Sequence, residues 1–375
     1  MKDNASALYS RYVIDGVRFD VSPGEMLDAA CGQTSPQQEF EPIVDERPDP
    51  DPRLLVFDSY KIGDYLAMTQ DLPPRKINAS YGGPYTRGCI AQALIGTLWR
   101  EGHFRLNDLQ VHAAWKWNPE PVGNMAGFYD SAEAACDYLD ALGLPLAGYQ
   151  FSEAKSNSLT VKCSLSKASE QLAQEEEEPI FEELPFRTLR PRLCTRRKCP
   201  ATLSGNEDSW LIYIPFDTCA FRLGGSLLAC LTGTPGGKAP EVMDPDYFID
   251  CFEVVRELVE DGIVLSGATV GDGGLMTALG NLCGEMGIAA DVSGLMKAYG
   301  EDDLVRILFS EVPGVLIEIR DYDFDYIDAE LLLQDVAYYP LGRPDRRGRI
   351  MVSDTGGISG ILGSLLSEGA VEGED

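Results

Sequence analysis

The stretch that decides the fold is a glycine-rich turn that opens a helix. Residues 264–283 read VLSGATVGDGGLMTALGNLC, and beyond the turn Leu275, Leu279, Leu282 and Met286 recur at helical spacing. Glycines let the backbone approach a ligand, and the first amides of a helix point outward with the positive end of its dipole. The turn is therefore a candidate phosphate site, although a plain tight connection before a helix has the same composition.

A second turn of the same kind, Gly224-Gly225-Ser226, follows a predicted strand at 211–216. Such a turn can cradle phosphate oxygens, and Asp272 in the first turn can hold magnesium beside a polyphosphate. Neither turn has the Lys-Ser/Thr pair of a P-loop, which excludes a Walker site. Taken alone, each turn is also compatible with a purely structural connection.

Outward from these turns, apolar periodicity predicts regular elements in two blocks. Strands alternating with helices in two blocks favour two α/β or α+β domains. Helices are predicted within 88–102 and over 125–142 and 245–261, and strands over 158–165, 314–320 and 349–353.

Composition divides the chain further. Residues 1–52, rich in Pro and Asp, predict a loosely structured lead-in, and 53–166 a first domain. Four consecutive glutamates and then a run of arginines mark 167–206 as a charged insertion or linker, or alternatively a docking element for a partner. A second domain is expected over 207–355 and a flexible tail over 356–375.

The charge and the cysteines exclude several classes of protein. A net charge of −29 on 375 residues argues against a nucleic-acid partner, but local amides and magnesium can still hold a nucleotide. The sequence contains no apolar run of membrane-spanning length and no signal-peptide core, so we expect a cytoplasmic protein without a membrane partner. Ten cysteines without a CxxC pair predict reduced, mostly buried thiols.

His112 is one of only two histidines, and it lies in a segment that can form a strand. A catalytic histidine needs a nucleophile or a carboxylate partner, and the sequence shows neither. We therefore predict a structural histidine and assign no catalytic residue. Trp115 and Trp117 nearby can pack in a core or stack on a base, and core packing is favoured.

Five segments, in order, resemble one known family. AQALIGTL at 91–98, LQVHAAWKW at 109–117, the LGGS turn, VGDGGLMTAL at 270–279 and LFSEVPGVLIEI at 308–319 are similar to segments of large-type formylglycinamide ribonucleotide amidotransferases. The resemblance implies an AIR-synthase-like two-domain unit. Its N-terminal domain pairs with a second copy into a barrel, and its C-terminal domain is an α/β layer. It also implies a ligase that uses ATP, Mg²⁺ and ammonia from a glutaminase.

Several positions depart from the family's pattern. The family's magnesium-holding Glu and Asn correspond here to Gln92 and Gly96, which are weaker ligands for a hard cation. The family's Lys-Asp pair corresponds to Tyr149-Gln150, and its His-Asp pair to residues 268–269, Ala and Thr. A single surviving carboxylate predicts weak or lost binding of ATP, ADP and Mg²⁺.

The residues that match the family's pattern predict a vestigial nucleotide-binding site. Asp272 with Gln92 is the remaining metal pair, and the two glycine-rich turns are expected to face a shared crevice. The nucleotide-binding residues would be Gly224, Gly225, Ser226, Asp272, Gly273 and Gly274.

The resemblance covers only the second AIR-synthase-like half, without the catalytic half or a glutaminase domain. The first hypothesis is accordingly the scaffold half of a split amidotransferase. Its partner would be a separate catalytic half, together with a glutaminase. The second is an inactive paralogue that acts as a homodimeric binding module, and the third a free-standing ATP-using enzyme. A lone half is expected to expose the apolar edge of the barrel, which would favour an oligomer.

Overall fold

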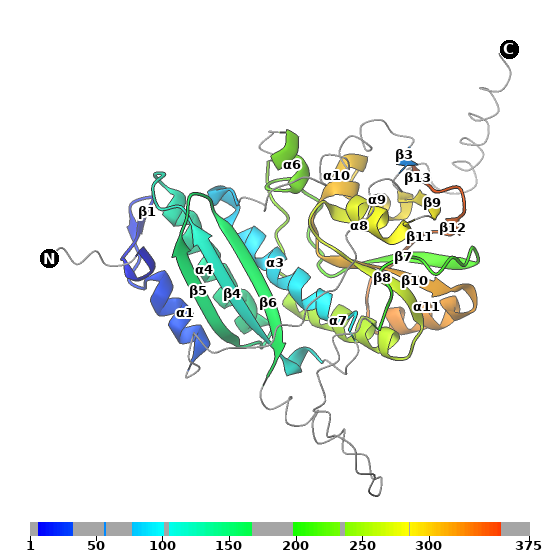
Figure 1. The fold of residues 1–375 in the computed structure, drawn as a ribbon, viewed down its shortest axis with the longest axis horizontal. Helices are drawn as coiled ribbons and strands as arrows, with labels where there is room; N and C mark the ends of the chain where they lie inside the picture. Colours follow the sequence, from blue (N-terminus) through cyan, green and yellow to red (C-terminus); the bar gives the residue numbers. More distant parts are fainter. Residues whose placement is uncertain are drawn as a thin grey trace, which may run out of the picture. The chain divides into compact units, whose positions relative to one another are not determined.

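In a computed structural model of the chain, two compact units form (Figure 1). The structure describes residues 7–32, 56–57, 77–100, 105–166, 198–232, 237–284 and 286–353. The first unit combines 1–47, 74–199 and 241–260, and the second combines 48–73, 200–240 and 261–375. Within the described ranges, no helix is both long enough and apolar enough to cross a bilayer.

A three-stranded sheet organises the first unit. β4 (Leu109–Trp117) is central, with β5 (Leu146–Glu153) parallel on one side and β6 (Ser158–Leu165) antiparallel on the other. The remaining elements of this unit are η1 (Ala7–Tyr9), β1 (Val13–Ile14), β2 (Val17–Arg18), α1 (Pro23–Cys31), η3 (Ala79–Tyr81), α3 (Gly82–Thr97), η4 (Leu106–Asp108), α4 (Asn124–Ala141) and α7 (Pro245–Glu260).

One face of this sheet forms the core of the unit. Trp115 and Trp117 are buried, and the Trp115 ring meets the edge of Phe128 on α4 at 6.2 Å. Both indole N–H groups find acceptors, Ser131 Oγ and the carbonyl oxygen of Asn124, each at 2.8 Å. Buried indoles need such partners, and here they have them. The prediction that these tryptophans pack in a core is confirmed.

The opposite face of the same sheet is polar. Because side chains alternate along a strand, the register places Gln110, Lys116, Gln150, Thr160 and Lys162 together on the side away from Trp115. All five are exposed or half-buried. This face therefore offers no continuous apolar surface among the described residues, and the expected apolar barrel edge of a lone half stays a prediction.

Residues 7–32 correct the expected lead-in. They form a short hairpin and the helix α1, which begins with a capping box between Ser22 and Glu25. Asp28 on α1 accepts hydrogen bonds from the hydroxyls of Tyr9 (3.0 Å) and Tyr149 (2.7 Å). This part of the lead-in is thus tied to β5 rather than loosely structured.

The second unit contains two four-stranded sheets. The first has the order β11 (Tyr339–Gly342), β7 (Ser209–Pro215), β10 (Gly314–Arg320) and β8 (Val264–Val270), and all its neighbours are antiparallel. The second has the order β12 (Pro344–Asp345), β9 (Gly287–Asp291), β13 (Arg349–Ser353) and β3 (Val56–Phe57). The helices are α6 (Leu227–Thr232), α8 (Gly274–Cys283), α9 (Ser293–Tyr299), α10 (Leu304–Phe309) and α11 (Phe324–Leu333), with η5 (Asp321–Asp323) before α11.

A fully buried carboxylate holds the start of the second unit to its first sheet. Glu318 on β10 accepts hydrogen bonds from the hydroxyls of Ser204, Ser209 and Ser266, each at 2.7 Å, and from the Ser204 amide at 2.8 Å. Four donors satisfy a buried carboxylate without a cation, which is the condition for burying it at tolerable cost.

The mixed α/β fold class predicted from the sequence is confirmed. The strands predicted at 158–165, 314–320 and 349–353 form over those residues, and the helices predicted at 125–142 and 245–261 form within one residue of their predicted bounds. The predicted domain boundaries stay a prediction, and the compact units differ from them because α7 is grouped with the first unit. The tail at 356–375 and most of the insertion, 167–197, lie outside the described residues.

His112 on β4 generates a prediction about pH. The ring is buried, its Nε2 lies 3.0 Å from Ser164 Oγ, and burial lowers its pKa to about 4. An unfolded histidine titrates near ~6.5, so the unfolded chain takes up this proton first as the pH falls. The histidine should therefore destabilise the fold progressively between those two values, by up to about 3 kcal/mol, with no effect above pH ~7.5.

The matched variant is His112→Gln, which can keep a hydrogen bond to Ser164 but does not titrate. The free energy of unfolding in urea should fall more steeply for the wild type than for the variant between pH ~6.5 and ~4. Parallel pH profiles for the two proteins would contradict the structural role of the neutral ring.

Candidate functional site

The glycine-rich turn Gly224-Gly225-Ser226 lies before α6. Gly224 donates its N–H to the Lys238 carbonyl oxygen at 2.8 Å, and a Cβ at Gly224 would clash with the backbone of Gly237 and Lys238. Gly225 has a φ of 71°, which favours glycine. Ser226 is buried, and its Oγ accepts the amide of Ala229 at 3.2 Å. The serine hydroxyl thus already has a partner within α6.

The other glycine-rich turn, residues 271–274, leads from β8 into α8. Gly273 and Gly274 have φ values of 78° and 68°, and the Gly274 amide closes the turn onto the Gly271 carbonyl oxygen at 2.8 Å. A Cβ on Gly274 would lie 2.6 Å from the carbonyl oxygen of Ser310. Both the dihedral and the lack of space therefore require glycine at 274.

One carboxylate joins the two turns. Oε1 of Glu311, just after α10, accepts the amide of Gly273 at 2.9 Å and the amide of Leu227, which follows Ser226, at 2.7 Å. Beside it, Ser310 Oγ accepts the amide of Arg222 at 2.9 Å. The two turns therefore lie next to each other, and the anion between them belongs to the chain itself. A crevice that both turns face stays a prediction.

Glu311 and Ser310 are the residues of this region that the sequence analysis did not single out. Both lie in the segment LFSEVPGVLIEI, but nothing local in it indicates that Glu311 meets backbone amides 38 and 84 residues away. Chemically, a carboxylate that accepts two backbone amides satisfies the donors that a phosphate would otherwise use.

The predicted metal pair falls on different units. Asp272 is exposed just before α8 in the second unit, whereas Gln92 lies on α3 in the first. Within the described part of the chain, no group of three or more His, Cys, Asp or Glu side chains can hold a metal ion. Magnesium binding by Asp272 and Gln92 stays a prediction.

The position that corresponds to the family's lysine carries a neutral phenol. Tyr149 is buried and donates to Asp28, and burial with this hydrogen bond raises the pKa of its hydroxyl above the ordinary value. The described cysteines are free thiols, and burial raises the pKa of both Cys163 and Cys283 to about 12. Because thiolate is the nucleophile, these two buried cysteines are unreactive.

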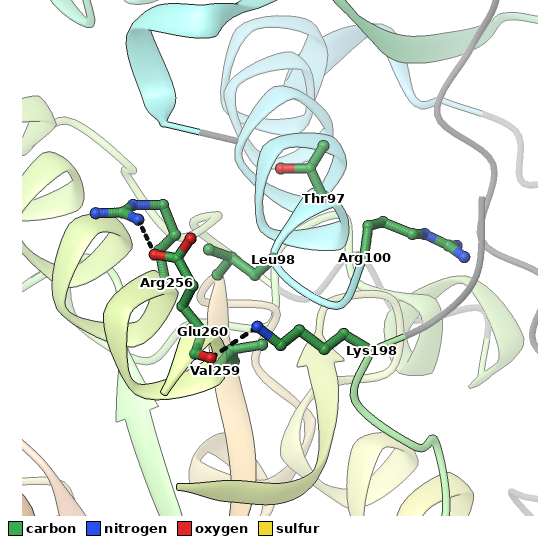
Figure 2. A pocket seen from close by; sticks show the side chains of 7 residues that line it. All are labelled: Thr97, Leu98, Arg100, Lys198, Arg256, Val259 and Glu260. Carbon is green, nitrogen blue, oxygen red and sulfur yellow. Dashed lines mark hydrogen bonds and ion pairs between the residues drawn. The ribbon is translucent and has the colours of Figure 1, made fainter. Parts of the chain in front are cut away.

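A small polar pocket in the first unit contains none of the predicted site residues (Figure 2). Its volume of about 10 Å³ has room for roughly one water molecule. Lys198 donates to the Glu260 carbonyl oxygen at 2.7 Å, and Arg256 is ion-paired with Glu260 at 2.6 Å. The lining residues are Thr97, Leu98, Arg100, Lys198, Arg256, Val259 and Glu260. The pocket is too small for a nucleotide.

The chain is similar in sequence to phosphoribosylformylglycinamidine synthases. A probable chloroplastic/mitochondrial phosphoribosylformylglycinamidine synthase of Arabidopsis thaliana is 27% identical over 258 residues, which cover 68% of this chain and 17% of the relative. A phosphoribosylformylglycinamidine synthase of Homo sapiens is 25% identical over 267 residues, covering 69% of this chain and 19% of the relative. No protein-family model matches the chain.

A solved structure of T. maritima PurL complexed with FGAR is similar in fold. Its TM-score is 0.51 at 13% identity, over 75% of this chain and 43% of that chain. The chain therefore shares the fold of this PurL structure over most of its length. In sequence it is related to phosphoribosylformylglycinamidine synthases. It spans less than a fifth of the length of these curated relatives.

The close approach at Gly274 gives the second prediction. Gly274→Ala should destabilise the protein by more than about 3 kcal/mol, because it adds a backbone clash to the cost of a positive φ. Gly284 also has a positive φ, 56°, but the atom nearest to a Cβ there would be a Thr202 methyl carbon at 3.7 Å, an ordinary contact. Gly284→Ala should therefore cost only about 1 kcal/mol.

The measurement is the free energy of unfolding in urea for both variants and the wild type. The difference between the two alanines reports the contact of Gly274 with the backbone of residues 308–310. Equal losses would show that the turn does not pack against the residue before Glu311.

Proposed function

We propose that the chain supplies the scaffold, or auxiliary nucleotide half, of a phosphoribosylformylglycinamidine synthase. Such an enzyme carries out an ATP-dependent amidation in de novo purine biosynthesis. A separate AIR-synthase-like protein would bring the catalytic half, and a glutaminase would supply ammonia. The relationship to the curated synthases supports the pathway.

The observation that carries the scaffold role is the engagement of both glycine-rich turns by Glu311. The amides of Leu227 and Gly273 are directed at one carboxylate oxygen. A nucleotide phosphate would have to displace this internal anion and would also meet its negative charge. The arrangement therefore favours a structural role for the two turns over a role in binding ATP.

The negative charge of the chain also disfavours nucleotide binding at these turns. Asp272 is the remaining acidic candidate for magnesium, and its side chain is exposed to solvent. The chain carries a net charge of −29, so one carboxylate without a bound cation adds to repulsion of a polyphosphate. Weak or lost binding of ATP, ADP and Mg²⁺ is the expected state of this half.

Magnesium–ATP binding tests this expectation. At about 1 mM magnesium–ATP, the wild type should show no thermal stabilisation beyond about 1 °C, because a ligand that does not bind the native state does not stabilise it. Asp272→Asn is the matched variant and should behave identically. A micromolar site would instead stabilise the wild type by about 4 kcal/mol, and loss of that shift in Asp272→Asn would place the site at the turn and overturn the proposal.

The divided-enzyme role predicts a specific partner. Affinity purification of the full chain from its own cells should recover a protein with an AIR-synthase-like catalytic half, and light scattering should show a mixed complex. Recovery of a homodimer alone would favour the competing hypothesis, an inactive dimeric binding module. A monodisperse monomer without any partner would count against both.

Whichever partner is present, a lone N-terminal domain of this kind needs a surface that pairs. The exposed face of the β5-β4-β6 sheet is polar, with Lys116 and Lys162 on it. We propose that hydrogen bonds and charge, rather than a continuous apolar core, contribute most of the contact there. Residence in the cytoplasm, the remaining expectation from the sequence, belongs to the same proposal.

A further inference from the structure

Helix α11 of the second unit exposes an apolar stripe (Figure 1, orange). Four large apolar side chains on η5 and α11 are exposed: Tyr322 at 76%, Tyr326 at 48%, Leu332 at 65% and Leu333 at 78%. Single exposed apolar residues are ordinary, but several on one short element mark a contact surface.

The helical repeat explains which of these residues lie together. Ile327 and Leu331, four apart, are fully buried and fix the inward side of α11, and the Phe324 ring packs on Trp210 of β7 at 5.4 Å. Tyr322, Tyr326 and Leu333 are spaced by four and seven residues and therefore fall on one line on the outer side. We call these three residues the α11 stripe. Ala329 lies between them and keeps the stripe apolar.

Acidic side chains flank the α11 stripe. Asp325 and Asp335 are exposed and Glu330 is half-buried, and among the residues that the structure describes none of the three has an ion-pair partner. By helical position, Asp325 lies on one side of the stripe and Glu330 on the other. Nearer η5, Arg320 pairs with Asp323 at 3.3 Å and lies over the Tyr322 ring at 5.8 Å. The unneutralised charge is thus concentrated along α11 itself.

We propose that the α11 stripe docks a basic amphipathic helix of a partner protein. Apolar residues of that helix would cover Tyr326 and Leu333, and its lysines or arginines would reach Asp325 and Glu330. Exposed tyrosines suit the centre of such an interface because they contribute large contact area at low entropic cost. A second copy of the same chain is disfavoured, because the acidic flanks of two copies would repel each other. The proposal concerns a surface apart from the glycine-rich turns and does not depend on the proposed function.

A synthetic peptide tests the docking. The probe is a fluorescein-labelled helix of about 14 residues with leucines at helical spacing and lysines elsewhere, and its counterpart has glutamates in place of lysines. Fluorescence anisotropy with the full chain should show binding of the lysine peptide and at least about tenfold weaker binding of the glutamate peptide. Tyr326→Ser combined with Leu333→Ser should weaken the lysine peptide at least about tenfold.

Two charge variants separate a specific site from general attraction to an acidic protein. Asp325→Lys with Glu330→Lys should weaken binding at least about tenfold, whereas Asp302→Lys with Glu241→Lys changes the net charge equally at exposed positions elsewhere and should change binding less than about twofold. Equal losses in the two charge variants would overturn the proposal, as would unchanged binding in the serine variant. A wild-type dimer that the serine variant abolishes in light scattering would identify a second copy as the occupant and overturn it as well.

Discussion

The hydrogen bonds to Oε1 of Glu311 are the interaction on which the glycine-rich region depends. They join the amide of Gly273, at the start of α8, to the amide of Leu227, at the start of α6. Hydrogen bonds to a charged acceptor contribute about 1.5–3 kcal/mol each, more than neutral ones. Because the acceptor follows α10 directly, three helices of the second unit begin or end at one carboxylate. The spacing of the turns is therefore set by the chain and requires no ligand.

This constraint changes how the glycines should be interpreted. In a site that closes on a phosphate, glycine lets the backbone approach the ligand. Here Gly274 lies against the Ser310 carbonyl oxygen, and Gly224 lies against the backbone at Gly237 and Lys238. The glycines are explained by close packing of backbone on backbone. Packing alone is therefore a sufficient reason for glycine at these two positions.

Local pattern was enough to predict the elements whose apolar period is long and uninterrupted, such as α4, α7 and β10. It failed for α1, whose capping box lies within a Pro- and Asp-rich region and whose packing depends on Tyr149, far along the chain. Sequence order also put α7 in the predicted second domain, whereas the helix is grouped with the first unit. Both glycine-rich turns were recognised locally. Glu311 was missed because its partners lie 38 and 84 residues away, and one acid among 60 carries no local signal.

The excess of acids over bases has a structural counterpart in how carboxylates are satisfied. Glu318 is buried against three serine hydroxyls and an amide, and Glu311 accepts two backbone amides, so these donors are all neutral. Neutral donors can satisfy a carboxylate locally but leave its charge in the total field of the protein. With 31 Lys and Arg against 60 Asp and Glu, the basic side chains cannot neutralise the charge of the acids. Where such acids flank exposed tyrosines and leucines, as along α11, this imbalance favours contact with a basic protein surface.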